Sequence, residues 1–187
     1  LGGQKDDLET AQRELYKVIE QLTDNMKEIF ATEFAKLNEY FGQTFREMFG
    51  GGHAELKLAD AADILNCGID ILVSPPGKAV KTITLLSGGE KAFVAIALHF
   101  AILKLRPTPF SVLDEIEAAL DDVNVGRFAQ YVRRLSDKTQ FIVITHRRGT
   151  MEAADMLYGV TMQEQGVSRM LMLNLAEAEK QLGKELK

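Results

Sequence analysis

The sequence predicts an α/β fold preceded by one long helix, and three observations carry this prediction. Between residues 5 and 48 there is no proline and a single glycine, and apolar residues recur at helical spacing. Two short segments, 110–113, which is apolar except for Ser111, and 141–144, which is fully apolar, each follow a helical pattern. Such segments are typical of strands in a sheet that helices cover on both faces. The chain has 187 residues, 46% of them hydrophobic, which suits one globular unit with an appendage.

The long helix divides into two parts by the spacing of its apolar residues. Leu8, Leu15, Leu22 and Ile29 recur every seven positions, which predicts the seam of a coiled coil. From Phe30 onward the apolar positions are richer in phenylalanine and lie three or four residues apart, as in a helix that docks on a globular body. We therefore expect residues 1–49 to form a coiled-coil end and a neck helix. A single amphipathic helix of an ordinary domain is the alternative.

The rest of the chain is expected to alternate strands and helices. Three consecutive glycines at 50–52 end the long helix. Beyond them, alternating apolar and polar residues or short apolar runs predict strands, and a spacing of three or four predicts helices. In chain order, the expected strands are 54–58, 69–73, 110–113, 141–144, 158–162 and 168–173, and the expected helices are 88–105, 123–135, 151–156 and 176–182.

Charge, apolar runs and cysteine content exclude several kinds of protein. A net charge of −5 argues against a protein that coats nucleic acid over its whole surface, although it permits a local basic patch. The longest apolar run, 93–105, contains His99 and Lys104 and is shorter than the ~18 residues of a membrane span. The first residues lack the order of a signal peptide. The single Cys67 excludes an internal disulfide and fits a reducing cytoplasm, so we expect a cytoplasmic protein. The short apolar run predicts that it has no membrane partner.

The segment Ser87-Gly88-Gly89-Glu90 is the first candidate site. Serine followed three residues later by glutamate is a capping box, so one interpretation is simply a well-capped helix start. That interpretation leaves the two glycines unexplained, since each costs roughly 0.5–1 kcal/mol relative to alanine inside a helix. A helix N-terminus with bare N–H groups and a serine hydroxyl also binds phosphate. The spacing alone leaves both interpretations open.

The second candidate site lies at the C-terminal ends of two apolar strands, where open α/β sheets bind ligands. One strand ends in Asp114-Glu115 and the other is followed by Thr145 and His146, so all these polar groups could face one cleft. Adjacent carboxylates repel each other, and the conflict is relieved if the first binds Mg²⁺ and the second takes a proton from water. The alternative is an exposed acidic loop, because further acidic residues, Glu117 among them, follow closely.

A phosphate-binding loop of the form G-x-x-x-x-G-K-[ST] is missing from the sequence. Gly77-Lys78 and Gly183-Lys184 lack both the upstream glycine and the following hydroxyl residue. An acidic strand end without the loop that binds the phosphates is only half of a nucleotide-binding site. A serine-hydrolase arrangement is also excluded, because no G-x-S-x-G motif surrounds Ser87.

Together these motifs resemble those of ABC-type ATPases. Residues 86–91 resemble the signature motif, 110–115 the Walker B strand, 119–121 the D-loop, and His146 the switch histidine. The run that follows the acidic pair is similar to structural maintenance of chromosomes (SMC) proteins of the bacterial and archaeal type. The resemblance covers about residues 50–173, and the long helix looks like the returning arm of the SMC coiled coil.

The resemblance implies that residues 50–187 form the C-terminal lobe of an ABC-type P-loop ATPase head, with Walker A in the N-terminal half of the same head. It implies that Asp114 holds Mg²⁺, that Glu115 activates the attacking water and that His146 contacts the γ-phosphate of ATP. This chain alone, lacking Walker A, would be inactive.

The same resemblance implies that catalysis needs two heads. The signature residues would bind the ATP held by the opposite head, and Asp121 would couple the two heads across their interface. The signature residues concerned are Ser87, Gly88, Gly89 and Lys91.

The implied biological role is ATP-driven chromosome condensation and segregation on the nucleoid. The implied partners are the N-terminal half of the head, a second SMC head, DNA and a kleisin whose winged-helix domain binds the C-terminal lobe. Candidate apolar contacts for the kleisin are Met162, Met170, Leu171 and Met172. The alternative, which we expect for any individual methionine, is that alternate members of this set lie in the core. Two other interpretations remain: the head half of a RecN-like DNA-repair ATPase, and a catalytically silent kleisin-binding module.

Overall fold

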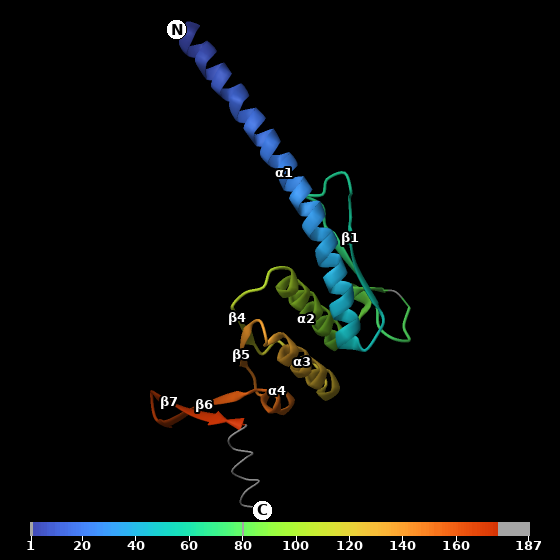
Figure 1. The fold of residues 1–187 in the computed structure, drawn as a ribbon, viewed down its shortest axis with the longest axis vertical. Helices are drawn as coiled ribbons and strands as arrows, with labels where there is room; N and C mark the ends of the chain where they lie inside the picture. The colour runs from blue at the N-terminus through green and yellow to red at the C-terminus, as the bar shows by residue number, and fades with distance from the viewer. Residues whose placement is uncertain (1, 80, 176–187) are drawn as a thin grey trace, which may run out of the picture. The chain divides into compact units, whose positions relative to one another are not determined.

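The computed structural model describes residues 2–79 and 81–175, so the helix expected at 176–182 lies outside the described residues (Figure 1). The chain divides into two compact units. The first runs to Leu86 and includes Ala97–Arg106, and the second consists of Ser87–Ile96 and the chain from Pro107 onward. No helix among the described residues is both long and apolar enough to cross a bilayer.

Helix α1 (Gly2–Phe49) opens the first unit and has one docked end and one exposed seam, as its apolar spacing predicts. Phe41 and Phe45, near its C-terminus, are fully buried. In the predicted coiled-coil seam, by contrast, Leu15 is 64% exposed and Ile29 is 60% exposed. A helix with such an unpaired apolar stripe is built to pack against another helix.

A three-stranded antiparallel sheet lies along the docked end of α1 (Figure 1). Its order is β1-β2-β3, so β1 is an edge strand, with a described strand on one side only. The sheet is followed by the 3₁₀ helix η1 (Ile83–Leu85). The strands are β1 (His53–Leu58), β2 (Ile69–Ser74) and β3 (Lys81–Thr82).

Two residues of α1, Asn38 and Gly42, let the helix approach the edge strand β1 closely. The Asn38 amide donates to the Leu56 carbonyl at 3.2 Å and accepts from the Leu56 N–H at 2.7 Å, so it takes the place of a neighbouring strand. A Cβ atom at Gly42 would lie 3.2 Å from the Ala54 carbonyl oxygen. Glycine inside a helix is unfavourable, but here it leaves room for the β1 backbone.

The turn after α1 depends on glycine for a steric reason as well as a conformational one. Gly50, Gly51 and Gly52 all have positive φ. A Cβ atom at Gly52 would lie 2.4 Å from the Ser74 carbonyl oxygen, closer than real Cβ contacts occur. The three glycines therefore end the helix and bring the chain directly against β2.

We expect the substitution Gly52→Ala to destabilise the first unit strongly. The left-handed backbone at φ +85° costs about 1–2 kcal/mol for a residue with a Cβ atom. The clash adds roughly 1–3 kcal/mol, the usual range for overpacking. Gly77→Ala is the matched control, because Gly77 also has positive φ but a Cβ atom there would meet nothing within 4 Å. Urea unfolding of both variants measures the difference, and equal destabilisation would contradict the steric contact.

The second unit contains every strand and helix that the sequence predicts for its described part. Helix α2 (Gly88–Leu105) begins in this unit and ends in the first. The short helix expected at 151–156 instead spans Arg148–Glu152, and Met156 already begins the next strand, so the expected bounds are wrong at both ends. The other elements are β4 (Phe110–Asp114), α3 (Asp122–Leu135), β5 (Gln140–Ile144), α4 (Arg148–Glu152), β6 (Met156–Glu164) and β7 (Val167–Asn174).

Strands β4 and β5 form a parallel pair with one buried and one exposed face. Leu113 on the buried face is 2% exposed. Four apolar side chains on the opposite face are each about half exposed: Phe110, Val112, Ile142 and Ile144. The prediction of a sheet covered on both faces is therefore wrong for the described residues, because they supply cover for one face only.

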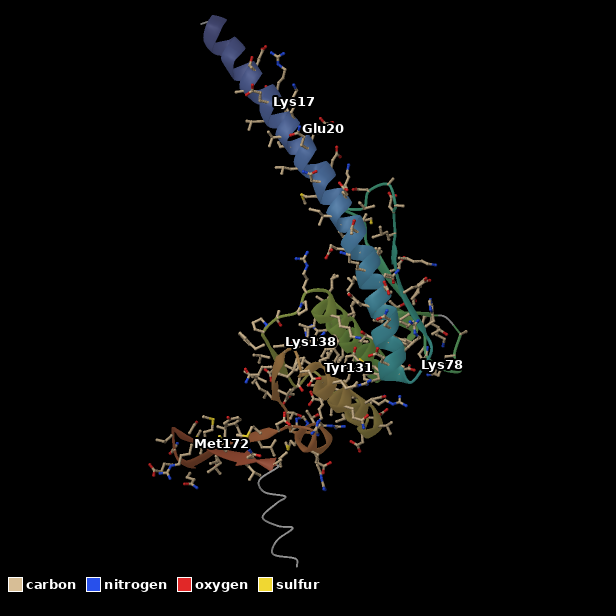
Figure 2. The ribbon with its side chains drawn as sticks, in the orientation of Figure 1. Lys17, Glu20, Lys78, Tyr131, Lys138 and Met172 are labelled. Atoms are coloured by element: carbon tan, nitrogen blue, oxygen red, sulfur yellow. The ribbon has the colours of Figure 1, made fainter. Side chains whose placement is uncertain are left out.

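Strands β6 and β7 form an antiparallel hairpin whose apolar side chains are exposed. Figure 2 shows Met172 among the side chains that project from it. The expectation that alternate kleisin candidates lie in the core is wrong, since all four are at least 62% exposed. One face of the hairpin carries Tyr158, Val160, Met162, Met170 and Met172, and Leu171 points to the other face.

Candidate functional site

The first candidate site is the N-terminus of α2, where the predicted capping box is present. The Ser87 N–H and hydroxyl both donate to Glu90 Oε2, at 3.1 and 2.9 Å. The Glu90 N–H is 3.4 Å from Ser87 Oγ. Ser87 itself is exposed. The helix start therefore already holds an anionic oxygen against the serine donors.

The two glycines of this segment serve different purposes. A Cβ atom at Gly89 would lie 3.1 Å from the carbonyl oxygen of Ala119, so this glycine lets the turn before α3 approach α2. A Cβ atom at Gly88 would meet nothing within 4 Å. No packing partner among the described residues therefore explains Gly88, which keeps the approach to the helix N-terminus open. Lys91 lies on the same first turn, and its N–H donates to the Ser87 carbonyl at 2.9 Å.

The second candidate site is formed where β4 and β5 end, and the predicted polar groups meet there. Glu115 Oε1 is 3.4 Å from His146 Nδ1, and the Glu115 N–H donates to the Ile144 carbonyl at 3.0 Å. The side chain of Glu115 is 56% exposed and that of His146 is 64% exposed, so both are open to a ligand. Asp114, the last residue of β4, is also exposed.

Glu115 has a strained backbone. Its φ of +47° makes it the single non-glycine residue with positive φ among the residues that the structure describes. Such a conformation costs about 1–2 kcal/mol and concentrates at functional sites. It turns the chain sharply after β4 while the Glu115 carboxylate stays beside His146.

Asp114 fits the part of a magnesium ligand. Mg²⁺ is usually held by one or two carboxylates, with phosphate and water oxygens completing its octahedron. In the described part of the chain, no group of three histidine, cysteine, aspartate or glutamate side chains could hold a metal alone. Asp114 could therefore supply one ligand, and the others would come from nucleotide, water and a second polypeptide segment.

Asp121 has a clear local role as the N-cap of α3. Its Oδ1 accepts from the Asn124 N–H at 2.8 Å, and its Oδ2 accepts from the Asn124 side-chain amide at 3.1 Å. The close approach of Gly89 to Ala119 brings the turn of residues 119–121 next to the start of α2. Coupling between two heads through Asp121 stays a prediction.

Glu117 is a residue that the sequence did not single out. The alternative of an exposed acidic loop is wrong at this position, since Glu117 is 0% exposed. Its Oε1 accepts from the Thr145 hydroxyl at 2.5 Å and from the Thr150 hydroxyl at 3.0 Å. Both threonines lie about thirty positions later in the chain, so no local pattern could reveal the pairing.

Arg147 makes a second connection between the turn after β4 and the loop after β5. Its guanidinium donates to the Leu120 carbonyl at 2.9 Å and to Asp122 Oδ1 at 3.0 Å. Its backbone N–H donates to the Thr145 hydroxyl at 2.9 Å. The loop that carries His146 is therefore tied to the turn that carries Glu115.

The fold is that of an ABC-type ATPase head, as comparison with solved structures shows. The chain belongs to the SMC family, because the family model described as the RecF/RecN/SMC N terminal domain matches residues 7–169.

Among individual relatives, it is similar to the chromosome partition protein Smc of Bacillus subtilis, with 55% identity over 179 residues, 96% of this chain. The chain spans about 15% of the length of that relative.

Two solved SMC structures are also similar to the chain. One comes from work on ATP-driven dimerization and DNA stimulated activation of SMC ATPases. It is 41% identical and has a TM-score of 0.75. The matched region covers 86% of this chain and 98% of the solved chain. The other is the Pyrococcus furiosus Smc head with an extended coiled coil, bound to the C-terminal domain of ScpA. It is 38% identical and has a TM-score of 0.80. The matched region covers 99% of this chain and 46% of the solved chain.

Proposed function

We propose that this chain is the C-terminal half of an SMC ATPase head, which hydrolyses ATP together with a Walker A half. The observation that carries the proposal is the exposed apolar face of β4 and β5. Parallel strands are normally covered on both faces, so a further part of the head is needed to cover Val112, Ile142 and their neighbours. The sequence also lacks a phosphate-binding loop, which the Walker A half would supply.

The strand ends would carry the chemistry. The Glu115 carboxylate takes a proton from the water that attacks the γ-phosphorus, while the bond from that phosphorus to the ADP oxygen breaks. His146, beside it, donates to a γ-phosphate oxygen. Asp114 is the magnesium ligand, and Mg²⁺ when bound neutralises charge on the phosphate oxygens. ADP and inorganic phosphate are the products.

The signature segment would bind ATP that a second head holds. The Ser87 N–H and hydroxyl already donate to the Glu90 carboxylate, so a γ-phosphate oxygen can replace that carboxylate as acceptor. Gly88 leaves the approach open, and the helix N-terminus favours negative charge. Lys91 would add a positive charge on the same turn, and Asp121 would couple the two heads.

The biological setting follows from the relatives. The chromosome partition proteins that the chain resembles support a role in chromosome partitioning. We extend this to condensation and segregation on the nucleoid, within the cytoplasm and in contact with DNA, and a similar structure from work on DNA stimulated activation of SMC ATPases supports the DNA contact. The chromosome partition proteins favour this role over that of a RecN-like repair ATPase. Residues 1–49 would be the end of the coiled-coil arm and its neck, and residues 50–187 the head lobe.

Mixing this chain with the Walker A half and Mg-ATP tests the proposal. We define the product of this mixing as the assembled head. Steady phosphate release that neither half shows alone is expected. Absence of turnover in every such mixture would favour the alternative of a catalytically silent kleisin-binding module.

The exposed β6–β7 hairpin is the proposed contact for the winged-helix domain of a kleisin. The face that carries Met162, Met170 and Met172 is apolar and rich in methionine, a residue enriched at interfaces. A solved Smc head bound to the C-terminal domain of ScpA supports a partner of this kind.

Met170→Glu is expected to weaken kleisin binding by about 1–3 kcal/mol, since it places a charge in the centre of the apolar contact. Leu171→Glu is the matched control. Leu171 is 63% exposed and Met170 is 69% exposed, but neighbouring residues of a strand point to opposite faces. Titration calorimetry of the assembled head with the winged-helix domain measures both. Equal loss in the two variants would contradict the assignment of this face.

A further inference from the structure

Glu117 connects the two strand ends that carry the proposed chemistry. It is fully buried, and a single carboxylate oxygen, Oε1, accepts hydrogen bonds from Thr145 and Thr150. Thr145 immediately precedes His146 in the chain, and Glu117 follows Glu115 by two positions. Glu117 is therefore two positions along the chain from Glu115, and one hydrogen bond and one peptide unit from His146.

The contacts around Glu117 hold one loop against the other at several points. The Glu115 N–H donates to the Ile144 carbonyl, just before Thr145. The Thr145 hydroxyl donates to Glu117 and accepts from the Arg147 N–H, so it is used in both directions. These contacts fix the backbone on both sides of His146, whose own ring is exposed.

Stability alone does not explain a carboxylate at this position. The second oxygen, Oε2, is buried and has no hydrogen-bond partner among the residues that the structure describes. A buried polar atom without a partner is costly, and well-packed apolar residues often stabilise a protein more than buried charges do. Every such atom in a native protein calls for an explanation outside packing, of which a functional role is one.

We propose that Glu117 is a positioning residue of the ATPase, which fixes the geometry of His146 relative to Glu115. The inference rests on the proposed function. Glu117 itself touches no reacting atom; it acts through Thr145, Thr150 and the loop that they begin and end.

The first test measures the kinetics of the assembled head. Glu117→Ala is expected to lower kcat by about tenfold or more, because small displacements of catalytic groups have large effects on rate. KM for ATP should stay within about twofold, since the residue contributes no contact to the nucleotide. Glu117→Gln keeps an acceptor oxygen for both hydroxyls and should recover most of the rate.

A double-mutant cycle with His146→Ala separates positioning from general destabilisation. If Glu117 acts through His146, then Glu117→Ala should cost little further activity once His146 has been removed. A purely structural role would give additive losses, or a loss in the amount of folded head with kcat per folded molecule unchanged. Either result would overturn the inference.

The second test does not depend on catalysis. This chain has three histidines, so if only this chain is isotope-labelled, the ring signals of His146 can be assigned by NMR in the assembled head with the help of His146→Ala. Thr150→Val removes one hydroxyl donor without touching either catalytic side chain, and Thr150→Ser retains it. Thr150→Val and Glu117→Ala are expected to shift the His146 ring signals, while Thr150→Ser leaves them in place.

The two tests distinguish failure of this inference from failure of the proposed function. A wild-type assembled head without ATPase activity contradicts the proposed function, and the ring signals then still decide whether Glu117 controls the geometry of His146. If the wild-type head is active but the substitutions at Glu117 and Thr150 change neither the His146 signals nor kcat, the inference is contradicted. The proposed function is then unaffected.

Discussion

Replacing Glu115 by glutamine is expected to lower ATP turnover of the assembled head by about 10²–10⁴-fold, the usual contribution of a general base. Glutamine has the same length as glutamate but accepts no proton from the attacking water. Binding of ATP and engagement of two heads should persist, because Asp114 and the signature segment remain intact. The engaged dimer should therefore accumulate.

Folding effects do not account for this expectation. Glu115 has a φ of +47°, and glutamine pays the same conformational penalty there as glutamate. The control is Glu152→Gln, the same chemical change at an exposed carboxylate that binds only the Arg148 side chain at 2.7 Å in the described structure. Phosphate release and analytical ultracentrifugation with ATP measure the two quantities. Unchanged hydrolysis would remove Glu115 from the mechanism.

The substitution Ser87→Arg is expected to abolish ATP-dependent engagement of two heads and to leave ATP binding to the Walker A half unchanged. Ser87 is exposed at the start of α2, and the space beside Gly88 is open. A guanidinium group and its long stem would fill the space that the phosphate of the opposite nucleotide needs. Positive charge at a helix N-terminus is also unfavourable.

Ser87→Ala separates the bulk of arginine from the loss of the hydroxyl. Both variants lose the cap, which costs about 0.5–2 kcal/mol, but alanine leaves the space open. Engagement should therefore be weakened by Ser87→Ala and absent in Ser87→Arg, as measured by sedimentation with ATP. Normal ATP-dependent dimerisation of Ser87→Arg would refute the role of this segment.

Features of the site that depend on local patterns could be predicted from the sequence. The spacing of Ser87 and Glu90 specifies a capping box, whose geometry involves only one turn of helix. The meeting of Glu115 and His146 follows from a general rule, because parallel neighbouring strands end at the same edge of a sheet.

Features that depend on distant residues could not be predicted. Glu117 stands in a run of acidic residues and looks like part of a solvated loop, and its burial depends on threonines far along the chain. The exposed face of β4 and β5 was missed for a related reason. An apolar strand signals that something covers it, but the sequence does not say whether the covering elements belong to the same segment of polypeptide.

Helix α1 has a mechanical consequence. Its 48 residues make it about 72 Å long if straight, and the buried residues among its described side chains all lie in the last third. A stiff rod held at one end amplifies motion: a tilt of about 10° at Phe41 displaces the far tip by roughly 10 Å. Shifts of side-chain size at the buried end thereby become displacements of about two strand spacings at the tip.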